Sequence, residues 1–475
     1  MTVAHSANII ANLEGILDIH IVGIGGAGMS AIARILHGWG MGVHGSDQRV
    51  SPITQRLQEE GIPVAQGHAA ENVGDADLVL ASSAVPDNNP ELIAARERGI
   101  RVARRPEFLT ALTAGYEVIA VAGAHGKTTV TGMIASVLSA AGLDPTYIVG
   151  GVVGNLGTNG RAGKGRHFVI EADEYRRTFL ALHPRVAVVT NVEFDHPDCF
   201  ADLRHLRLAF GEFVENVVPG GLLVACADDE IARAIAAARH AGGGRVSLYG
   251  LAPGLDVAWS ARDLVQNDVG GFSFRAVHDG AALGSVALRI PGEFNVANAL
   301  AALAVADEAG VDFEVAREVL AAFSGTERRF EILGEVAGVV VIDDYAHHPT
   351  QIRGNLAAAR QRYSERRLVA VWEPHTFSRI RALHADFMTA FGAADEVVVM
   401  PIYAAREEDD GTLTAADLAQ QVAHPSVRSA DSLEGAVDQL AAMCEPGDVV
   451  LMMGAGNEYI AGRRLLAELQ KKRGR

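Results

Sequence analysis

The stretch Val118–Thr129 constrains the fold of this chain more than any other segment. It runs Val-Ile-Ala-Val-Ala-Gly-Ala-His-Gly-Lys-Thr-Thr, an apolar run followed by a glycine turn, a lysine and two threonines. The apolar run predicts a buried strand, and the spaced apolar residues after it predict a helix. Backbone N–H groups at a helix N-terminus, the helix dipole and the lysine all attract anions, so the stretch predicts a site for nucleotide phosphates.

The predicted phosphate loop has the spacing Gly123-x-x-Gly126-Lys127-Thr128, which is shorter than the G-x-x-x-x-G-K-[ST] pattern. The alternative is a glycine turn that binds nothing. The flanking strand and helix favour a nucleotide, with Thr128 placed to ligate Mg²⁺.

The composition excludes several classes of protein. A chain of 475 residues predicts two to four domains. The net charge of −17 argues against a general nucleic-acid binder. Three widely spaced cysteines predict a reducing compartment, the cytoplasm, and no disulfide framework. There is no signal peptide pattern and no apolar run of about 18 residues, so we expect no membrane span.

A second glycine motif, Gly23-x-Gly25-x-x-Gly28, follows an apolar strand near the start of the chain. A helix comes next, with Met29, Ile32, Ala33 and Leu36 on one face, and then a strand at 42–46 that ends at Asp47. This pattern matches the dinucleotide fingerprint. Taken alone it favours NAD(P), but a nucleotide-linked substrate satisfies it equally.

Two further features belong to this first third. Ser82 and Ser83 follow a strand predicted at 77–81 and could contact a base or ribose, or could instead cap a helix. The proline at 106 and the polar residues after it predict a domain boundary between about 106 and 117.

The middle third places polar clusters at two successive strand ends. Glu171 follows a strand at 167–170, and His196 follows one at 186–190. Glu171 could ligate the Mg²⁺ shared with Thr128, and His196 a second ion; the alternatives are a helix cap at Asp173 and a turn around His196. We expect the glycine-rich stretch 150–160 to be a loop, and the alternating runs in 245–290 to be antiparallel strands with a turn at 279–280.

Asn295 precedes an alanine-rich helix that runs to about residue 309. The asparagine is the natural helix cap, and an exposed amide there could instead contact a base edge. A second boundary is predicted at 325–330. Beyond it, βα alternation returns, and four strands, at 339–342, 368–372, 396–400 and 449–453, end in polar or glycine-rich text. Histidines follow two of them, His347-His348 and His375, which suggests a site facing the central domain.

Together these motifs resemble the Mur ligases of peptidoglycan synthesis. The matching text is HIVGIGGAGMS at 20–30, GAHGKTT at 123–129, EADE at 171–174, NVEFDH at 191–196, NVANA at 295–299, RRF at 328–330, DDYAHHPT at 343–350 and EPHTFSR at 373–379. Within the family, the text is most similar to the ligases that join L-alanine to UDP-N-acetylmuramate. The resemblance covers nearly the whole chain in family order.

The resemblance implies an α/β protein of three domains: a Rossmann-like domain for the UDP-sugar (1–112), a P-loop-type ATPase domain with a mainly parallel sheet plus a small antiparallel sheet (113–326), and a Rossmann-like domain for the amino acid (327–475). It implies ATP and Mg²⁺ as cofactors, UDP-N-acetylmuramate and L-alanine as substrates, and an acyl phosphate intermediate. It says nothing of the oligomeric state.

The resemblance also implies roles for individual residues. Catalysis would fall to Lys127, His348, His375 and Arg379, and Mg²⁺ binding to Thr128, Glu171 and His196. The ATP site would contain Gly123, Ala124, His125, Gly126, Lys127, Thr128, Thr129, Asn295 and Arg328. Tyr345 would bound the alanine pocket with the histidines. The other substrate contacts would be Gly25, Gly26, Ala27, Gly28, Met29, Ser30, Asp47, Ser82 and Ser83.

The chain departs from the family pattern at Ala124, where threonine is frequent, at Arg176-Arg177, and at Asn457-Glu458 in the last glycine motif. Some relatives bind a second Mg²⁺ through a carbamylated lysine, but no lysine lies between Lys164 and Lys471. The alternatives are the ligase that adds a preformed tripeptide to the same UDP-sugar, a nicotinamide oxidoreductase, and a regulatory ATP-binding protein without ligase activity.

Overall fold

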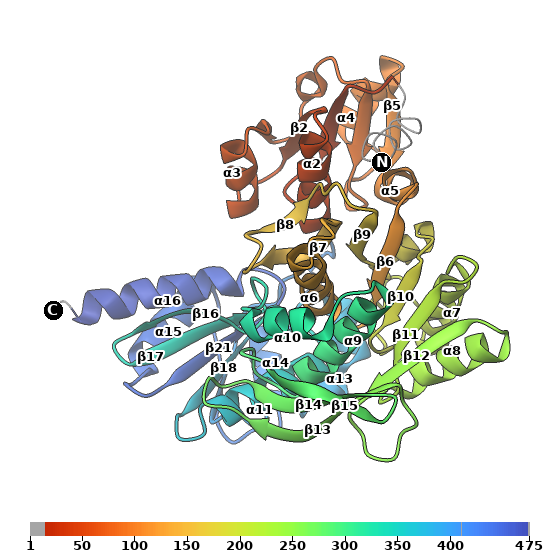
Figure 1. Cartoon of the computed structure of the whole chain (residues 1–475). Helices are drawn as coiled ribbons and strands as arrows, with labels where there is room; N and C mark the ends of the chain where they lie inside the picture. Colours follow the sequence, from red (N-terminus) through yellow and green to blue (C-terminus); the bar gives the residue numbers. More distant parts are fainter. Residues whose placement is uncertain (1–14, 410, 474–475) are drawn as a thin grey trace.

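The computed structural model describes residues 15–409 and 411–473. Three sheets, of five, ten and six strands, follow one another along the chain, each with helices packed on it, so the predicted α/β class is confirmed (Figure 1). In the described part of the chain, no helix combines the length and the apolar character that a membrane crossing requires.

The first sheet is parallel and has the strand order β3-β2-β1-β4-β5. Its strands are β1 (Asp18–Val22), β2 (Gly42–Asp47), β3 (Val64–Gln66), β4 (Leu78–Ala81) and β5 (Arg101–Arg104), and its helices are α2 (Ala27–Gly38), α3 (Pro52–Glu59), η1 (Ala70–Val73), α4 (Pro90–Glu97) and α5 (Arg105–Thr113). The predicted apolar face of α2 is buried. The strand order reverses between β1 and β4, which opens a crevice at their carboxyl ends.

The central sheet has the order β15-β14-β13-β12-β11-β10-β6-β9-β7-β8. Its strands are β6 (Glu117–Ala122), β7 (Thr146–Val153), β8 (Thr158–Arg161), β9 (His167–Glu171), β10 (Val186–Val189), β11 (Leu222–Cys226), β12 (Arg245–Gly250), β13 (Trp259–Gln266), β14 (Phe272–His278) and β15 (Ala281–Ala287). The predicted antiparallel strands are present. They extend the same sheet, because β13 pairs in parallel with β12 and antiparallel with β14.

Helices cover both faces of this sheet. Apolar side chains of α6 (Lys127–Ala140), α9 (Phe294–Glu308) and α10 (Phe313–Ala322) share one core, and those of η2 (Tyr175–Ala181), α7 (Leu203–Glu215) and α8 (Glu230–Ala241) share the other. The strand and helix predicted around the phosphate loop are β6 and α6. Because helices bury both faces of the sheet, its parallel strands are unbroken apolar runs in the sequence.

The glycine-rich stretch 150–160 was predicted as a loop, and that prediction is wrong. It forms the hairpin of β7 and β8, and α2 of the first sheet packs on it. A Cβ on Gly160 would lie 2.6 Å from Ala31 Cα. The glycine therefore serves a close contact between two elements.

The third sheet has the order β16-β17-β21-β18-β19-β20, with only β16 antiparallel to its neighbour. Its strands are β16 (Glu331–Val336), β17 (Val339–Asp344), β18 (Leu368–Trp372), β19 (Glu396–Val399), β20 (Val427–Ser429) and β21 (Val449–Met453). Its helices are α11 (Pro349–Arg362), α12 (Phe377–Ala382), α13 (His384–Met388), α14 (Ala415–Gln421), α15 (Leu433–Met443) and α16 (Glu458–Arg473).

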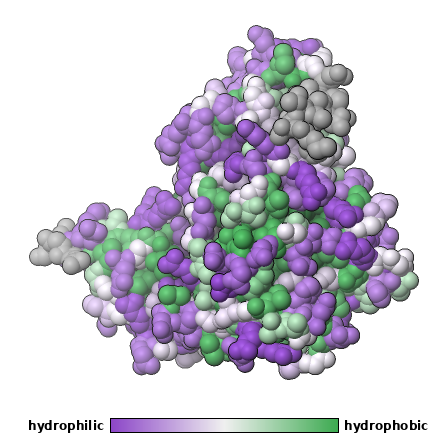
Figure 2. Space-filling view, viewed as in Figure 1, coloured by the Kyte–Doolittle hydropathy of each residue, from purple (hydrophilic) through white to green (hydrophobic). Residues whose placement is uncertain are grey.

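The four strands predicted in this last third are β17, β18, β19 and β21. They are parallel neighbours, so their polar carboxyl ends lie on one edge of the sheet. That edge contacts the central sheet through several side chains described below. The space-filling view shows hydrophilic and hydrophobic residues interspersed over the visible face of the molecule (Figure 2).

Candidate active site

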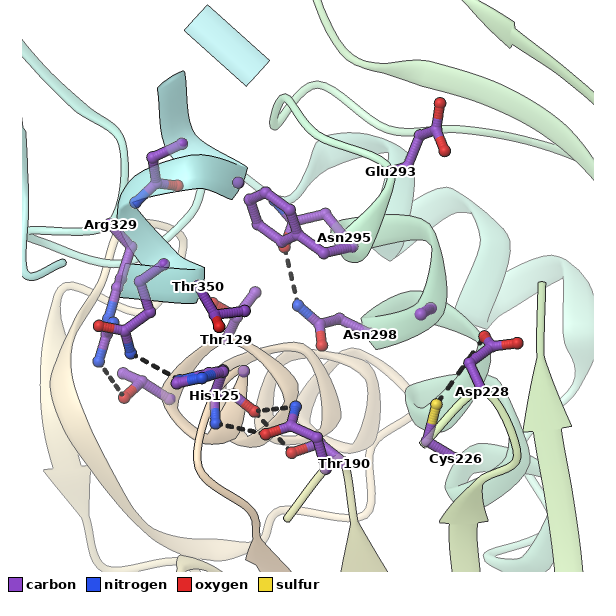
Figure 3. Close-up of a pocket in the computed structure, with 18 of the residues that line it drawn as sticks. His125, Thr129, Thr190, Cys226, Asp228, Glu293, Asn295, Asn298, Arg329 and Thr350 are labelled. Atoms are coloured by element: carbon purple, nitrogen blue, oxygen red, sulfur yellow. Dashed lines mark hydrogen bonds between the residues drawn. The ribbon is translucent and has the colours of Figure 1, made fainter. Parts of the chain in front are cut away.

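A cavity of about 640 Å³ lies at the carboxyl ends of β6, β10 and β11. It is lined by the N-terminus of α6, the start of α9 and residues of the C-terminal domain, among them Arg329 and Thr350 (Figure 3). Figure 3 shows His125, Thr129 and Thr190 at one end of it and Cys226 and Asp228 at the other. Open α/β sheets bind ligands at this edge.

The phosphate loop needs glycine at two positions. Gly123 has φ 142° and Gly126 has φ 83°. A Cβ on Gly123 would lie 1.9 Å from Thr190 Oγ1, and one on Gly126 would lie 2.6 Å from Asn298 Oδ1. Ala124 N–H donates to the Asn191 carbonyl at 3.1 Å. Because this bond uses the backbone, the turn forms without the hydroxyl that is frequent at position 124 in the family.

Lys127 stands at the first position of α6 beside a buried carboxylate. Its Nζ lies 2.9 Å from both carboxylate oxygens of Glu174, which is 2 % exposed. Burial lowers the pKa of Lys127, but the carboxylates of Glu174, Asp173 and Glu171 raise that pKa by more. Lys127 is therefore a fixed cation at the helix N-terminus, where anions bind.

Two of the three predicted metal ligands are in contact. Thr128 Oγ1 donates to Glu171 Oε1 at 3.1 Å, and Glu171 Oε2 accepts the Gly150 N–H at 2.7 Å. A Cβ on Gly150 would lie 2.4 Å from that oxygen, so glycine there makes room for the carboxylate. His196, in contrast, has Nε2 3.7 Å from Glu174 and 3.8 Å from Asp195.

The prediction that Asn295 caps α9 is wrong. The N-cap is Glu293, and Asn295 lies within the first turn. Its side-chain amide donates to the Pro291 carbonyl at 2.7 Å, and its Oδ1 accepts from Asn298 Nδ2 at 2.9 Å. Both asparagines line the cavity, so the amides remain candidates for contact with a base (Figure 3).

Arg328 and Arg329 point in different directions. Arg328 pairs with Asp343 at 3.4 Å and more closely with Glu458, and its guanidinium lies between the rings of Tyr345 and Tyr459. Arg329 lines the cavity, with Nη2 3.4 Å from Thr128 Oγ1. The placement favours Arg329, and not the predicted Arg328, as the arginine that faces the cavity.

The C-terminal domain contributes a buried cluster around Arg379. Arg379 Nε donates to Asp195 Oδ1 at 2.6 Å, and its Nη1 lies 2.8 Å from His375 Nδ1. His347 Nε2 lies 3.6 Å from Asp195 Oδ2. Burial, together with Arg379, lowers the pKa of His375 to about 2 and that of His347 to about 3, so both rings are neutral donors or acceptors.

Tyr345 and His348 flank His347 in the sequence and have different contacts. Tyr345 stacks on both arginines and meets the His347 ring edge-on. His348 caps α11, accepting the Thr350 N–H at Nδ1, and its Nε2 lies 3.2 Å from the Phe194 carbonyl. At 2 % exposure, His348 joins the domains and has little surface free for a substrate.

The first glycine motif lies at the crevice between β1 and β4. Gly25 N–H donates to Asp47 Oδ2 at 3.0 Å, so the glycine turn and Asp47 lie together at this crevice. The side chains of Met29 and Ser30 are buried, and Ser30 N–H donates to the Gly26 carbonyl at 2.8 Å. The helix-cap alternative for Ser82 and Ser83 is wrong, because Asn89 caps α4.

Arginines connect this crevice to the central domain. Arg105 lies against Gly28, where a Cβ would be 2.7 Å from its Cζ, and its Nη1 is 3.8 Å from Asp173. Arg176 Nη1 donates to the Ser83 carbonyl at 2.8 Å. Arg176 and Arg177 both have positive φ, 50° and 55°. This strained turn is held where it bridges the two domains.

Sequence reasoning missed the roles of Glu174, Asp195, Arg105, Arg329 and Gln351. Glu174 and Asp195 belong to polar segments that follow two predicted strands. Their position at the carboxyl edge of the sheet is the signal that could have identified them. For Arg329 no signal exists, because two adjacent arginines are equivalent until the backbone direction is known.

Comparison with known proteins defines the class. Family models match residues 18–117 (Mur ligase family, catalytic domain), 121–306 (Mur ligase middle domain) and 328–456 (Mur ligase, glutamate ligase domain). The chain is also 41–46 % identical to curated relatives over nearly its full length, including those described next. It belongs to the Mur ligase family.

The relatives are more specific than the family. A UDP-N-acetylmuramate–L-alanine ligase from Kineococcus radiotolerans is 46 % identical, over 96 % of this chain and 96 % of that protein. The ligase of the same name from Desulforapulum autotrophicum is 43 % identical, over 94 % of this chain and 98 % of that protein.

Solved structures agree. The UDP-N-acetylmuramate–alanine ligase of Thermotoga maritima is 29 % identical with a TM-score of 0.81, covering 96 % of this chain and 99 % of its own. A murein peptide ligase of Psychrobacter arcticus is 27 % identical with a TM-score of 0.73 over the same shares.

Proposed function

We propose that this chain is an ATP-dependent ligase that joins L-alanine to the lactyl carboxylate of UDP-N-acetylmuramate in peptidoglycan precursor synthesis. One structural observation carries the proposal. Asp195 and His196 stand between the phosphate loop and the C-terminal domain: His196 approaches Glu174, the partner of Lys127, and Asp195 pairs with Arg379. A carboxylate activated beside Lys127 is thereby next to the side chains of the amino-acid domain.

The reaction balances in two steps. A lactyl carboxylate oxygen attacks the γ-phosphorus of ATP, and ADP leaves. The L-alanine nitrogen then attacks the acyl carbon, the C–O bond to phosphate breaks, and the amine loses a proton as the amide forms. In phosphoryl transfer the protein contributes mostly positioning and charge neutralisation. We assign that task to Lys127 and the backbone N–H groups of residues 123–129.

The residues fit a magnesium ion at the phosphate loop. A threonine hydroxyl and a carboxylate 3.1 Å apart, Thr128 and Glu171, are hard oxygen donors of the kind that Mg²⁺ prefers. We assign them to one ion and His196 to a second. When bound, Mg²⁺ would neutralise charge on the phosphates. Thr128 and Glu171 are already held in place by Arg329 and by the backbone of Gly150.

The remaining assignments follow the positions of the side chains. We assign Asn295 and Asn298 to the adenine end of the cavity, and Arg329 to the phosphate end. His375 and Arg379, with Tyr345, bound the alanine pocket, and His348 holds α11 against the central domain. Residues 25–30, Asp47, Ser82 and Ser83 hold the UDP-sugar in the first of three domains, with boundaries at 112/113 and 326/327. A reaction that consumes ATP and a UDP-sugar belongs in the cytoplasm, where we place the protein.

An assay of ADP release tests the proposal. With UDP-N-acetylmuramate and Mg²⁺, L-alanine is expected to drive turnover and a preformed tripeptide is not. Tripeptide-dependent turnover would move the chain to the murein peptide ligases. ATP binding without any amino-acid-dependent turnover would favour a regulatory protein, and NAD(H) binding without response to the UDP-sugar would favour an oxidoreductase.

A further inference from the structure

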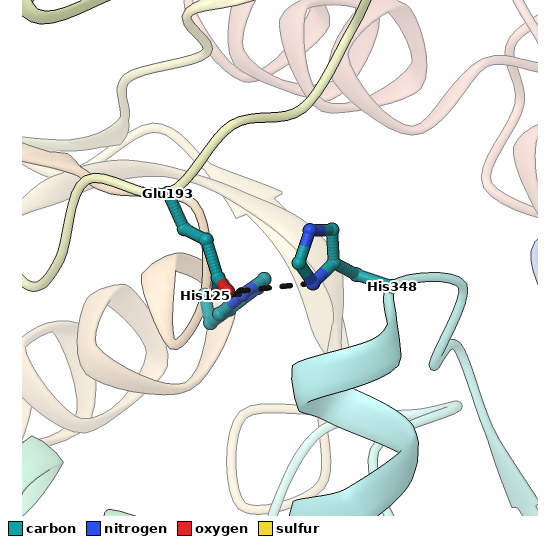
Figure 4. A group of neighbouring side chains, drawn as sticks. All are labelled: His125, Glu193 and His348. Atoms are coloured by element: carbon teal, nitrogen blue, oxygen red, sulfur yellow. Dashed lines mark hydrogen bonds and ion pairs between the residues drawn. The ribbon is translucent and has the colours of Figure 1, made fainter. Parts of the chain in front are cut away.

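A chain of hydrogen bonds joins the first turn of α11, in the C-terminal domain, to the phosphate loop. Gln351 Nε2 lies 2.9 Å from His125 Nδ1, and His125 Nε2 lies 2.7 Å from Glu193 Oε2. Glu193 Oε1 accepts from Thr350 Oγ1 at 2.6 Å, which returns the chain to α11. Figure 4 shows His125 beside Glu193, with His348 projecting from the helix toward them.

The direction of these hydrogen bonds is determined. Gln351 Oε1 accepts from the backbone N–H groups of His347 at 3.0 Å and His348 at 3.2 Å. The amide nitrogen of Gln351 therefore faces His125 and donates to it. His125 Nδ1 then accepts, so the ring proton is on Nε2 and is donated to Glu193.

The same direction argues against a metal ion at this place. His125, Glu193 and His348 have donor atoms within 4.8 Å of one another, as metal ligands would. A metal on His125 Nε2 would move the ring proton to Nδ1, opposite the Gln351 N–H. His348 Nδ1 already accepts the Thr350 N–H at 3.3 Å. The second ring nitrogen of a metal-binding histidine usually donates a hydrogen bond to an acceptor. Here Nδ1 of His125 and Nδ1 of His348 each accept a hydrogen bond instead, so the cluster forms a hydrogen-bond relay.

Both backbone polar groups of His125 are hydrogen-bonded, so a force on its ring acts on the phosphate loop. Its N–H donates to Asn191 Oδ1 at 2.8 Å, and its carbonyl accepts from Thr190 Oγ1 at 2.6 Å. The next two residues are Gly126 and Lys127, which begin α6. A movement of α11 that pulls on the His125 ring therefore strains the loop that carries Lys127.

We propose that Gln351 is a positioning residue that couples docking of the C-terminal domain to nucleotide binding, acting through His125 and Glu193. The inference rests on the proposed nucleotide site and adds control of that site by the amino-acid domain. With α11 docked, both ring nitrogens of His125 are bonded and the loop is held. With α11 displaced, the ring loses Gln351, and the loop is less well ordered for phosphate.

A double-mutant cycle on nucleotide binding tests the relay. Calorimetric titration of the full chain with ADP and Mg²⁺, without UDP-sugar or amino acid, does not depend on the ligase reaction. Gln351→Ala and His125→Ala are each expected to weaken ADP binding roughly three- to tenfold, as the loss of a hydrogen bond does. The double variant is expected to lose no more ADP affinity than the single variant with the larger loss.

Arg353→Ala is the matched control on the same helix, because Arg353 bonds to the Asp386 carbonyl and Thr389 within its own domain. Its ADP affinity is expected to equal that of the wild type. Additive effects in the cycle would overturn the relay while leaving the nucleotide site intact. Failure of the wild type to bind ADP would overturn the nucleotide site and the relay together.

Gln351→Glu gives a readout that a merely structural role would not move. The new carboxylate still accepts from the His347 and His348 N–H groups but cannot donate to His125. A His125 ring with one N–H can then donate to Glu193 or to the new carboxylate, but not to both.

ADP binding by Gln351→Glu is therefore expected to weaken roughly three- to tenfold relative to wild type, because one hydrogen bond of the relay is lost although the side chain keeps its shape. An ADP affinity equal to that of the wild type would overturn the assignment of Gln351 as the donor.

Discussion

Arg379 and Asp195 form an ion pair between the C-terminal and central domains, with 2.6 Å between Arg379 Nε and Asp195 Oδ1. Each residue is 4 % exposed. Burial raises the pKa of Asp195, but Arg379, His196 and His347 together lower that pKa well below its ordinary value. The pair therefore remains charged, and it fixes His375 next to the segment that carries His196.

The first prediction concerns this pair. Asp195→Asn keeps the shape of the side chain but leaves the Arg379 charge buried without a counter-ion. Truncating one partner of such a pair costs about 2–5 kcal/mol. We expect kcat/KM for L-alanine to fall by about thirtyfold or more, measured by ADP release. Asp198→Asn, in the same segment but exposed, is the control and is expected to lose little.

The second prediction concerns Lys127. Lys127→Ala is expected to abolish phosphate release while UDP-sugar binding stays nearly intact, because the two sites lie on different sheets. Since the variant leaves Glu174 buried alone, Lys127→Ala combined with Glu174→Gln is expected to recover thermal stability without activity. Lys164→Ala, at an exposed position, is the control. Loss of UDP-sugar binding together with phosphate release in Lys127→Ala would contradict the assignment of two separate sites.

Much of this architecture could be predicted because the parallel strands are buried on both faces. Such strands appear as unbroken apolar runs, and the polar text that follows each run marks the carboxyl edge where ligands bind. That is why β6, β17, β18 and β21 could be predicted from the sequence, together with the position of Glu171, His196 and His375 at strand ends.

The errors have physical causes too. Asn295 precedes a run of helix formers, but its amide bonds back to Pro291, and α9 already begins at Phe294, ahead of the predicted cap. Arg328 and Arg329 cannot be told apart in the sequence, because the direction of each side chain depends on the local backbone, and Arg328 has the unusual φ of 60°. Partners distant in sequence, such as Gln351 and His125, become visible only when two domains are docked.

The third prediction separates two substrates at His375. The ring is far from the phosphate loop in sequence and faces Arg379, His347 and Tyr403. His375→Ala is therefore expected to raise the KM for L-alanine about tenfold or more, as loss of a buried contact of roughly 1.4 kcal/mol does, with a smaller change in the KM for ATP. His384→Ala, elsewhere in the same domain, serves as the control. A larger effect on ATP would place His375 outside the amino-acid pocket.

The fourth prediction concerns the UDP-sugar. Arg105 lies against Gly28 at the start of α2, where a diphosphate would meet the helix N-terminus. A hydrogen bond to a charged group contributes about 1.5–3 kcal/mol. Arg105→Ala is thus expected to raise the KM for UDP-N-acetylmuramate roughly ten- to a hundredfold and to spare that for ATP. The exposed Arg101→Ala is the control, and an equal rise for both substrates would contradict the assignment.

The last prediction concerns a buried carboxyl pair. Glu373 and Glu458 lie beneath the end of β21, 4 % and 0 % exposed. Burial, and then the hydrogen bond and repulsion of Glu458, raise the pKa of Glu373 from 4.5 to about 9. Between pH 4.5 and about pH 9, Glu373 keeps its proton in the folded protein, whereas the unfolded chain has lost it. Stability therefore falls as the pH rises, by at most about 1.4 kcal/mol per pH unit from this group.

Glu373→Gln mimics the protonated carboxyl, since its oxygen can accept the Asn457 N–H and its amide can donate to Glu458. The variant is expected to match the wild type near pH 5 and to become progressively more stable than it as the pH rises toward about 9. Urea unfolding at a series of pH values measures this difference. Glu365→Gln, at an exposed position, is expected to show no such trend. A constant difference at every pH would mean that Glu373 is ionised in the folded protein.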